Sequence, residues 1–330
     1  MKKASQIIKE QILPYLSPSV RTILNMVSPD LLNQVEEIRL RSVQGLMIIL
    51  PGLGGAFLDQ RGCISSQHKA YLVVSKEIED TLELLSGYSI YACEEELRQG
   101  YLTIPGGHRV GLAGRAVIEN GAVKILNCIS SMNIRVSRQV LGAGEKVVPF
   151  LIDRRKGRIY HTIVISPPQA GKTTLLRDLA RSISQGEGVF NQGLKVSIID
   201  ERSEIAGCYQ GVPQLDTGCR TDVLDACPKA EGIMMALRAL SPQVIITDEI
   251  GREEDIQAIE EAVNSGVSVI TSAHGCSLDD IFHRPILNKL IQKNYFERLV
   301  ILSSRDGPGT IETIVEGEKG LPLYSSRGGE

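Results

Sequence analysis

Residues 166–180, SPPQAGKTTLLRDLA, combine the residue types that phosphate binding needs. An apolar run, residues 163–165, precedes them, and Leu175, Leu176 and Leu179 follow at helical spacing. A strand, a tight loop, Gly-Lys-Thr and a helix form the context of a phosphate-binding loop, because loop N–H groups and the positive end of the helix dipole converge on phosphate oxygens. We therefore expect a nucleotide-binding loop here. The alternative is a chance turn.

Two residues of this loop have specific expected roles. Lys172 is expected to reach the terminal phosphates, and Thr173 to place its hydroxyl on Mg²⁺. The usual pattern begins with Gly, whereas this chain has Ser166, and Gly171 keeps the backbone freedom that a close approach to phosphate favours. The residues expected to bind ATP are Ser166, Pro167, Pro168, Gln169, Ala170, Gly171, Lys172, Thr173 and Thr174.

Acidic residues follow two further apolar runs. The run 195–200 ends in Asp200, and Glu201 and Glu204 follow it. These carboxylates could orient or deprotonate water, or hold Mg²⁺ through water. In isolation such a run would indicate a solvated turn. Residues 244–249, VIITDE, would deliver Asp248 to the Mg²⁺ shell and Glu249 to the attacking water. Together with the phosphate-binding loop, the acidic residues at these strand ends indicate nucleotide hydrolysis. Glu249, Glu201 and Glu204 are therefore candidate catalytic residues.

A histidine and several arginines complete the candidate site. His274 follows the apolar run 267–271, where a polar side chain can sense the γ-phosphate, and it is the fourth catalytic candidate; a structural role is the alternative. Phosphoryl transfer also calls for an arginine besides the loop lysine. The candidates in this half are Arg202, Arg220, Arg238 and Arg252, and those in the first half are Arg109, Arg115 and Arg135, possible ligands of a neighbouring subunit's nucleotide.

The elements that must position these residues form a mainly parallel sheet. Apolar strands alternate with helices from about residue 159, which is typical of a parallel α/β sheet whose ligands bind at the carboxyl ends of the strands. The expected strands are 159–165, 195–200, 243–248, 267–273 and 298–303, with a hairpin strand at 310–315. We assign residues 156–330 to this ATPase domain.

The first half is expected to form a smaller α+β domain, residues 1–155, that ends in a linker at about 138–158. Short amphipathic helices come first, then strands at 37–41 and 46–50, a helix at 75–86 with Ser75 as its N-cap, and a helix at 91–99. Strands follow at 101–104, 108–116, 123–128 and 132–136, separated by Gly-Gly and Asn-Gly hairpin signals. The sequence Gly52-Leu53-Gly54-Gly55 fits a hairpin turn better than a KH-type nucleic-acid loop.

Composition excludes several classes of protein. The chain has 330 residues, 42% of them hydrophobic, and a net charge of −3, with 19 Lys/Arg against 15 Asp/Glu in residues 1–156 and 17 against 24 in the rest. Neither half is basic enough to indicate nucleic-acid binding. Seven scattered cysteines without a metal-binding spacing, no secretory signal and no apolar run of membrane-spanning length favour a soluble, cytoplasmic protein with reduced thiols.

The segments around these motifs resemble the stage III sporulation protein AA family. The resemblance rests on residues 200–232, DERSEIAGCYQGVPQLDTGCRTDVLDACPKAEG, on 239–255, ALSPQVIITDEIGREED, on TSAHG at 271–275, and on EEIRLR, YACEEELRQGYLTIPGGHRVGLAGR and SSMNIRVSR at 36–41, 91–115 and 130–138. More distantly the chain is similar to secretion-superfamily ATPases of type II and type IV systems and pilus motors. The resemblance covers nearly the whole chain.

The resemblance implies more than the residues alone do. It implies a RecA-like P-loop ATPase domain, a hexameric ring with ATP between the two domains of each subunit, and work on membrane-embedded components of a sporulation channel between mother cell and forespore. The family's acidic box, Walker B glutamate and His box fall on Asp200, Glu201 and Glu204, on Glu249, and on His274. Its phosphate-binding arginines are carried over to Arg109, Arg115 and Arg135, and Asp248 stands where secretion motors often have Gly. A location at the inner face of a membrane, through a partner, would follow.

Two other functions remain open. One is a nucleotide-gated module that binds single-stranded nucleic acid, as in related plastid and bacterial P-loop proteins with an added Arg-x-x-x-His domain. We expect no stable nucleic-acid partner, because the chain ends soon after the sheet, at Glu330, and has no basic face. The other is a scaffold that binds ATP with little turnover, against which Lys172, Asp248 and Glu249 argue.

Overall fold

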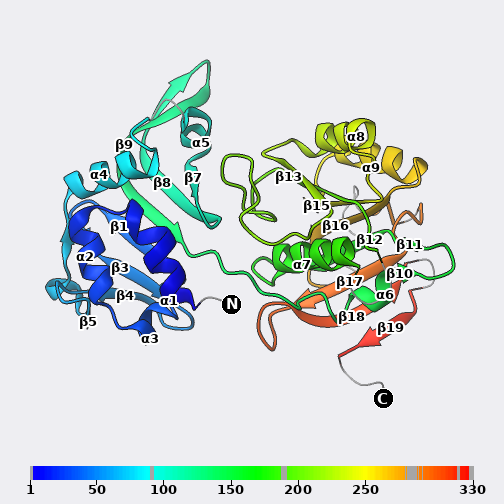
Figure 1. Cartoon of the computed structure of the whole chain (residues 1–330), viewed down its shortest axis with the longest axis horizontal. Coiled ribbons are helices and arrows are strands. Elements are labelled where there is room, and N and C mark those ends of the chain that lie inside the picture. The colour runs from blue at the N-terminus through cyan, green and yellow to red at the C-terminus, as the bar shows by residue number, and fades with distance from the viewer. Residues whose placement is uncertain are drawn as a thin grey trace. The chain divides into compact units, whose positions relative to one another are not determined.

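The chain folds into two compact units, Met1–Arg138 and Gln139–Glu330 (Figure 1). The computed structural model describes residues 3–89, 93–186, 192–278, 280, 288, 290–291, 293–317 and 320–326. The predicted α/β architecture, with a smaller α+β domain before a mainly parallel sheet, is confirmed by these elements. Among the described residues no helix is long and apolar enough to cross a membrane.

The first unit is an antiparallel sheet covered by helices. The sheet has the order β5-β4-β3-β1-β9-β8-β7, and every neighbouring pair is antiparallel. Its strands are β1 (Glu37–Arg41), β3 (Met47–Leu50), β4 (Gly54–Leu58), β5 (Ile64–Ser65), β7 (Tyr101–Ile104), β8 (His108–Glu119) and β9 (Ala122–Arg135), and β2 (Gln44–Gly45) and β6 (Leu72–Val73) form a separate pair. The helices are α1 (Ala4–Ile7), which continues as a π-helix (Ile8–Ile12) and a 3-10 turn (Leu13–Tyr15), α2 (Pro18–Met26), α3 (Pro29–Leu32), α4 (Ser75–Leu85) and α5 (Glu94–Gln99), with a further 3-10 turn at Gln67–Lys69.

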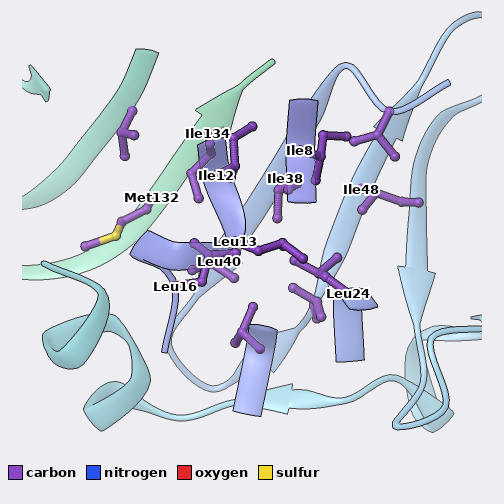
Figure 2. Close-up of a cluster of buried hydrophobic side chains, with 14 of the residues drawn as sticks. Ile8, Ile12, Leu13, Leu16, Leu24, Ile38, Leu40, Ile48, Met132 and Ile134 are labelled. Carbon is purple, nitrogen blue, oxygen red and sulfur yellow. The ribbon is translucent and has the colours of Figure 1, made fainter. Parts of the chain in front are cut away.

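The core of this unit lies between its N-terminal helices and the sheet. Figure 2 shows Ile8, Ile12 and Leu16 of the N-terminal segment facing strand residues such as Ile38 and Ile134. All five side chains are fully buried. Alternate residues of β1 and β9 thus supply the apolar face that the helical stripe covers.

Several local expectations for the first unit can now be compared with the structure. The Gly-Gly and Asn-Gly hairpins are confirmed, and Asn120 and Gly121 have φ values of 52° and 79°, as a tight hairpin turn requires. The strands expected at 123–128 and 132–136 are one strand, β9, which continues through an irregularity near Cys128. The helix at 75–86 is confirmed, but its N-cap is Val74, whose N–H donates to Oε2 of Glu77 at 2.9 Å, so Ser75 is not the cap. The start of the helix expected at 91–99 lies outside the described residues.

The second unit is built on an eight-stranded sheet with the order β14-β13-β15-β16-β12-β17-β18-β19. The strands from β14 to β17 are parallel, and β18 and β19 are antiparallel. The strands are β12 (Thr162–Ser166), β13 (Val196–Asp200), β14 (Thr221–Asp225), β15 (Val244–Glu249), β16 (Ser268–His274), β17 (Arg298–Ser303), β18 (Thr310–Glu316) and β19 (Pro322–Ser325). All six expected strands are present, although the one expected at 159–165 begins only at Thr162, and β14 and β19 are additional.

Helices cover both faces of this sheet. Helix α7 (Lys172–Gln185) packs on one face through residues such as Leu179, in the same apolar cluster as Val164 of β12. Helices α8 (Lys229–Ala239) and α9 (Glu253–Asn264) pack on the other face, in the cluster that contains Ile163 and Ile165. The central strands, such as β12 and β13, are buried along their whole length because both faces of the sheet are covered there.

The boundary between the units lies at the start of the expected linker, not near its end at residue 155. Residues 139–158 belong to the second unit, where they form α6 (Val148–Leu151), β10 (Ile152–Asp153) and the start of β11 (Arg158–Ile159). Val147 and Leu151 are fully buried in its core, and the Gly144 N–H donates to Asp178 of α7 at 2.7 Å. The segment is packed rather than a free connection, so the boundary at 155 is replaced by Arg138/Gln139.

Candidate nucleotide-binding site

The loop between β12 and α7 has the conformation that its sequence predicts. Strand β12 ends at Ser166 and α7 begins at Lys172, with Gly171 as its N-cap at a φ of 88°. A Cβ on Gly171 would lie 2.8 Å from the backbone N of Gly309, which itself donates to Ala170 O at 3.0 Å. Position 171 therefore admits only glycine, both for its backbone angle and for the approach of the β17–β18 loop.

The departure at Ser166 has a local explanation. The Ser166 hydroxyl donates to the Pro167 carbonyl at 2.9 Å, and the Ser166 carbonyl accepts from Lys172 Nζ at 3.3 Å. The side chain is fully buried at the end of β12. The Ser166 side chain stabilises the start of the loop through this hydrogen bond. The loop therefore adopts its conformation without a glycine at its first position.

A pocket of about 750 Å³ lies over the loop. It gathers residues from the carboxyl ends of β12, β13, β15 and β16, which is where parallel sheets bind ligands. Its lining includes Pro168, Gln169, Gly171, Lys172, Thr173, Thr174, Glu201, Glu204, Asp248, Glu249 and His274. Of the residues expected to bind ATP in this loop, Ser166, Pro167 and Ala170 lie outside the lining. The expected catalytic and metal-binding side chains are brought together.

His274 joins the loop lysine to the strand-end glutamate. Its Nδ1 lies 2.7 Å from Nζ of Lys172, and its Nε2 lies 2.7 Å from Oε2 of Glu249. Because the lysine ammonium only donates, Nδ1 accepts and Nε2 carries the proton that is donated to the glutamate. The order of the strands explains the contact, since β16 lies between β12 and β15 and Ser166 is in register with His274.

Two carboxylates of the pocket share one lysine. Lys229, the first residue of α8, lies with Nζ 2.9 Å from Oδ1 of Asp248 and forms an ion pair with Glu201. Burial disfavours the charge of Lys229, but its two carboxylate partners outweigh this effect and raise its pKa. Burial raises the pKa of Asp248, and the contact with Lys229 opposes that rise.

The segment that carries Glu201 and Glu204 is held by buried polar groups. Asp200 is fully buried, and its carboxylate accepts from the N–H groups of Glu204, Ile205 and Ala206, each at 2.9 Å. Burial raises its pKa to about 6. From α7, Arg177 donates to the carbonyls of Glu204 and Ile205, and burial lowers the pKa of Arg177 to about 10. Asp200 thus shapes the loop, whereas Glu201 and Glu204 line the pocket.

The arginine candidates separate into three groups. Arg202 and Arg252 line the pocket, whereas Arg220 donates to the Ser184 carbonyl and Arg238 lies exposed on α8. In the first unit, the guanidinium of Arg109 lies 3.6 Å from the ring centre of Tyr101, and Arg135 donates to Glu37 at 3.1 Å. Arg115 is exposed on β8.

The pocket offers oxygen atoms of Thr173 and Asp248 as ligands for Mg²⁺. Within the described part of the chain, no group of three or more His, Cys, Asp and Glu side chains could hold a metal ion by itself. Thr173 and Asp248 line the pocket together and offer a hydroxyl and a carboxylate oxygen, the donor types that Mg²⁺ takes alongside phosphate oxygens. The residues present therefore fit a metal that binds with the nucleotide.

Some residues of the site carry no signal that sequence reasoning used. Lys229 follows Pro228 at the start of α8, and the sequence motifs assign it no role. Pro308 lines the pocket from the β17–β18 loop, far from any motif. A charged residue at the buried start of a helix, where an acid is usual, is the signal that could have identified Lys229.

Similarity to known proteins shows the family of this chain. The family described as sporulation stage III, protein AA, matches residues 6–323. The chain belongs to that family. A stage III sporulation protein AA from Bacillus subtilis is 46% identical over 306 residues, which cover 93% of this chain and 94% of the relative.

Two solved structures share the fold of this family member at low sequence identity. The ATPase DotB of Legionella pneumophila has a TM-score of 0.56 at 13% identity, covering 91% of this chain and 80% of its own. The pilus retraction motor PilT, solved with bound ADP, has a TM-score of 0.51 at 14% identity, covering 91% and 78%. The RecA-like secretion-ATPase fold expected from the sequence is therefore confirmed.

Proposed function

We propose that this protein is an ATPase that hydrolyses ATP to ADP and phosphate. The observation that carries the proposal is the meeting of Lys172, Glu249 and His274 in one pocket with Thr173 and Asp248. They come from three places in the parallel sheet: the start of α7 after the loop, the end of β15 and the end of β16. A site that binds nucleotide without hydrolysing it needs the phosphate-binding loop, but it does not need a carboxylate and a histidine beside that loop. Membership of the family and the fold shared with DotB and PilT support the same assignment.

In the proposed reaction, the loop N–H groups and Lys172 bind the phosphates and stabilise the charge of the transition state. Glu249 orients water for attack on the γ-phosphorus and accepts its proton while the bond from the γ-phosphorus to the β–γ bridging oxygen breaks. His274 holds Glu249 and Lys172 at a fixed separation, and arrival of the γ-phosphate would compete for Lys172. Glu201 and Glu204 assist at the same edge. Mg²⁺, held by Thr173 and Asp248, would neutralise phosphate charge.

The family suggests what the energy is used for. We infer that subunits assemble into a hexameric ring and act on membrane-embedded components of a sporulation channel, from a cytoplasmic position at the membrane. Arginines of the first unit, Arg109, Arg115 and Arg135, are proposed to reach the nucleotide phosphates. Closing and opening of the two units with each ATP would transmit the motion.

Steady-state ATP hydrolysis by the full chain tests the proposal. We expect phosphate release that requires Mg²⁺, is abolished by EDTA, and rises per subunit with protein concentration, because a ring completes the site. A rate per subunit that does not depend on concentration would count against the ring but not against hydrolysis. Tight single-strand binding that weakens steeply with salt, without hydrolysis, would favour the nucleic-acid alternative.

A further inference from the structure

Lys229 is an unusual residue for its position. It is 7% exposed, although lysine is almost never buried without a partner. It is also the first residue of α8, where the helix dipole disfavours a positive charge. Helix α8 has one acid in its first turn, Glu231, whereas α9 has three, Glu253, Glu254 and Asp255, and no lysine. The helix itself therefore gives no reason for a lysine at this position.

The surroundings of Lys229 supply the reason. Its ammonium forms ion pairs with Glu201, from the end of β13, and with Asp248, from the end of β15. These strands are neighbours, so without a cation two carboxylates would face each other in one pocket. Such a pair is the kind of site that attracts a divalent cation.

We propose that Lys229 is a built-in counter-ion that occupies the cation position between Glu201 and Asp248, so that the divalent metal enters with the nucleotide and not before it. This inference rests on the proposed function, because it assigns the order in which metal and ATP bind in the same pocket. With Lys229 in place, Oδ1 of Asp248 already has a cation at 2.9 Å. The phosphates of ATP must then supply the additional negative charge that holds the metal.

The inference goes beyond a stabilising ion pair. Buried ion pairs are weak contributors to stability, because removing both charges from water costs about as much as their attraction returns. If the ammonium of Lys229 does not occupy the cation position, removing it should leave metal binding unchanged. If Lys229 is a counter-ion, its removal should increase the affinity for divalent cations, because Glu201 and Asp248 can then bind the cation by themselves.

Binding of Mn²⁺ in the absence of nucleotide, followed by electron paramagnetic resonance or calorimetry, tests this directly. The native chain should bind Mn²⁺ weakly, and Lys229→Met should bind one Mn²⁺ at least about tenfold more tightly. Lys229→Arg, which keeps the charge, should behave as the native chain, and adding Glu201→Gln to Lys229→Met should remove the gain. Lys293→Met, which breaks an exposed ion pair with Glu260, is the matched control and should change nothing.

The native chain provides a second measurement in case Lys229→Met does not fold. It should bind Mn²⁺ at least about tenfold more tightly with a non-hydrolysable ATP analogue than without it. Equal Mn²⁺ affinity with and without the analogue, or no gain in a folded Lys229→Met, would overturn the inference. None of these readouts depends on turnover, so a chain that shows the Mn²⁺ pattern without hydrolysing ATP refutes the proposed function alone.

Discussion

Nε2 of His274 lies 2.7 Å from Oε2 of Glu249, although the two residues end different strands. The other ring nitrogen of His274 contacts the loop lysine, Lys172, at 2.7 Å. One imidazole therefore fixes the separation between the residue proposed to activate water and the residue proposed to bind phosphate. A change at His274 should affect the chemical step more than nucleotide binding.

Replacing His274 with Ala is expected to lower kcat for ATP about 10- to 100-fold, because Glu249 loses its partner and its orientation. The dissociation constant for ATP should change less than about threefold, since the loop itself is intact. Steady-state kinetics and nucleotide titration measure the two effects separately. His68→Ala, an exposed histidine of the first unit, is the control. Equal loss of binding and of turnover would contradict the proposed role.

Replacing Gly171 with Ala is expected to weaken nucleotide binding at least about tenfold. Alanine is strained at a φ of 88°, and its Cβ would lie 2.8 Å from the Gly309 nitrogen, so either the loop or its neighbour must move. Gly251→Ala is the matched control, because Gly251 lines the same pocket and a Cβ there meets nothing within 4 Å. Titration with a fluorescent ATP analogue measures both variants. Equal affinity of Gly171→Ala and Gly251→Ala for the analogue would show that the loop is not constrained as the structure indicates.

Acid should destabilise the first unit through His108. This fully buried ring accepts from the Ser137 N–H through Nδ1 at 2.9 Å, and Nε2 contacts Oε1 of Gln11 at 3.0 Å. Burial lowers its pKa to about 4. The unfolded chain therefore binds the proton more readily, so stability is complete above about pH 6.5 and falls as the pH drops toward 4.

The size of this effect can be estimated and measured. Between pH 7.5 and pH 5 the His108 contribution to the free energy of unfolding should decrease by about 2 kcal/mol. Urea unfolding of the full chain at the two pH values, compared with His108→Asn, gives the difference. The Asn variant keeps an acceptor for Ser137 but does not titrate, so it should lose less stability in acid than the native chain. Identical losses would show that His108 is not the titrating group.

The sequence predicted the parts of the site that lie at the ends of apolar strands. Parallel strands bring their carboxyl ends to one edge, so the loop, Asp248, Glu249 and His274 could be expected together without knowledge of their distances. The ion pair of Lys229 could not be predicted in this way. It depends on where α8 begins relative to β13 and β15, which is set by packing rather than by a motif.

Sequence patterns missed one strand with weak burial and one segment whose packing depends on a few apolar residues. Strand β14, TDVLD, is a polar edge strand with no fully buried residue, so its pattern lacks the apolar run that marked its neighbours. The linker expected at 138–158 contains glycines and charges, yet Val147 and Leu151 bury completely against the second unit. The composition of this segment indicated an exposed linker, whereas a few apolar side chains pack it into the core of the second unit.

The most direct test of the central claim compares Glu249→Gln with Lys172→Ala for ATP binding and for a single turnover with Mg²⁺. Glu249→Gln should bind ATP within about threefold of the native chain but hydrolyse it at least about 100-fold more slowly, because only the activation of water is lost. Lys172→Ala should lose both binding and hydrolysis. If Glu249→Gln hydrolyses bound ATP at the native rate, the pocket is not the hydrolytic site described here.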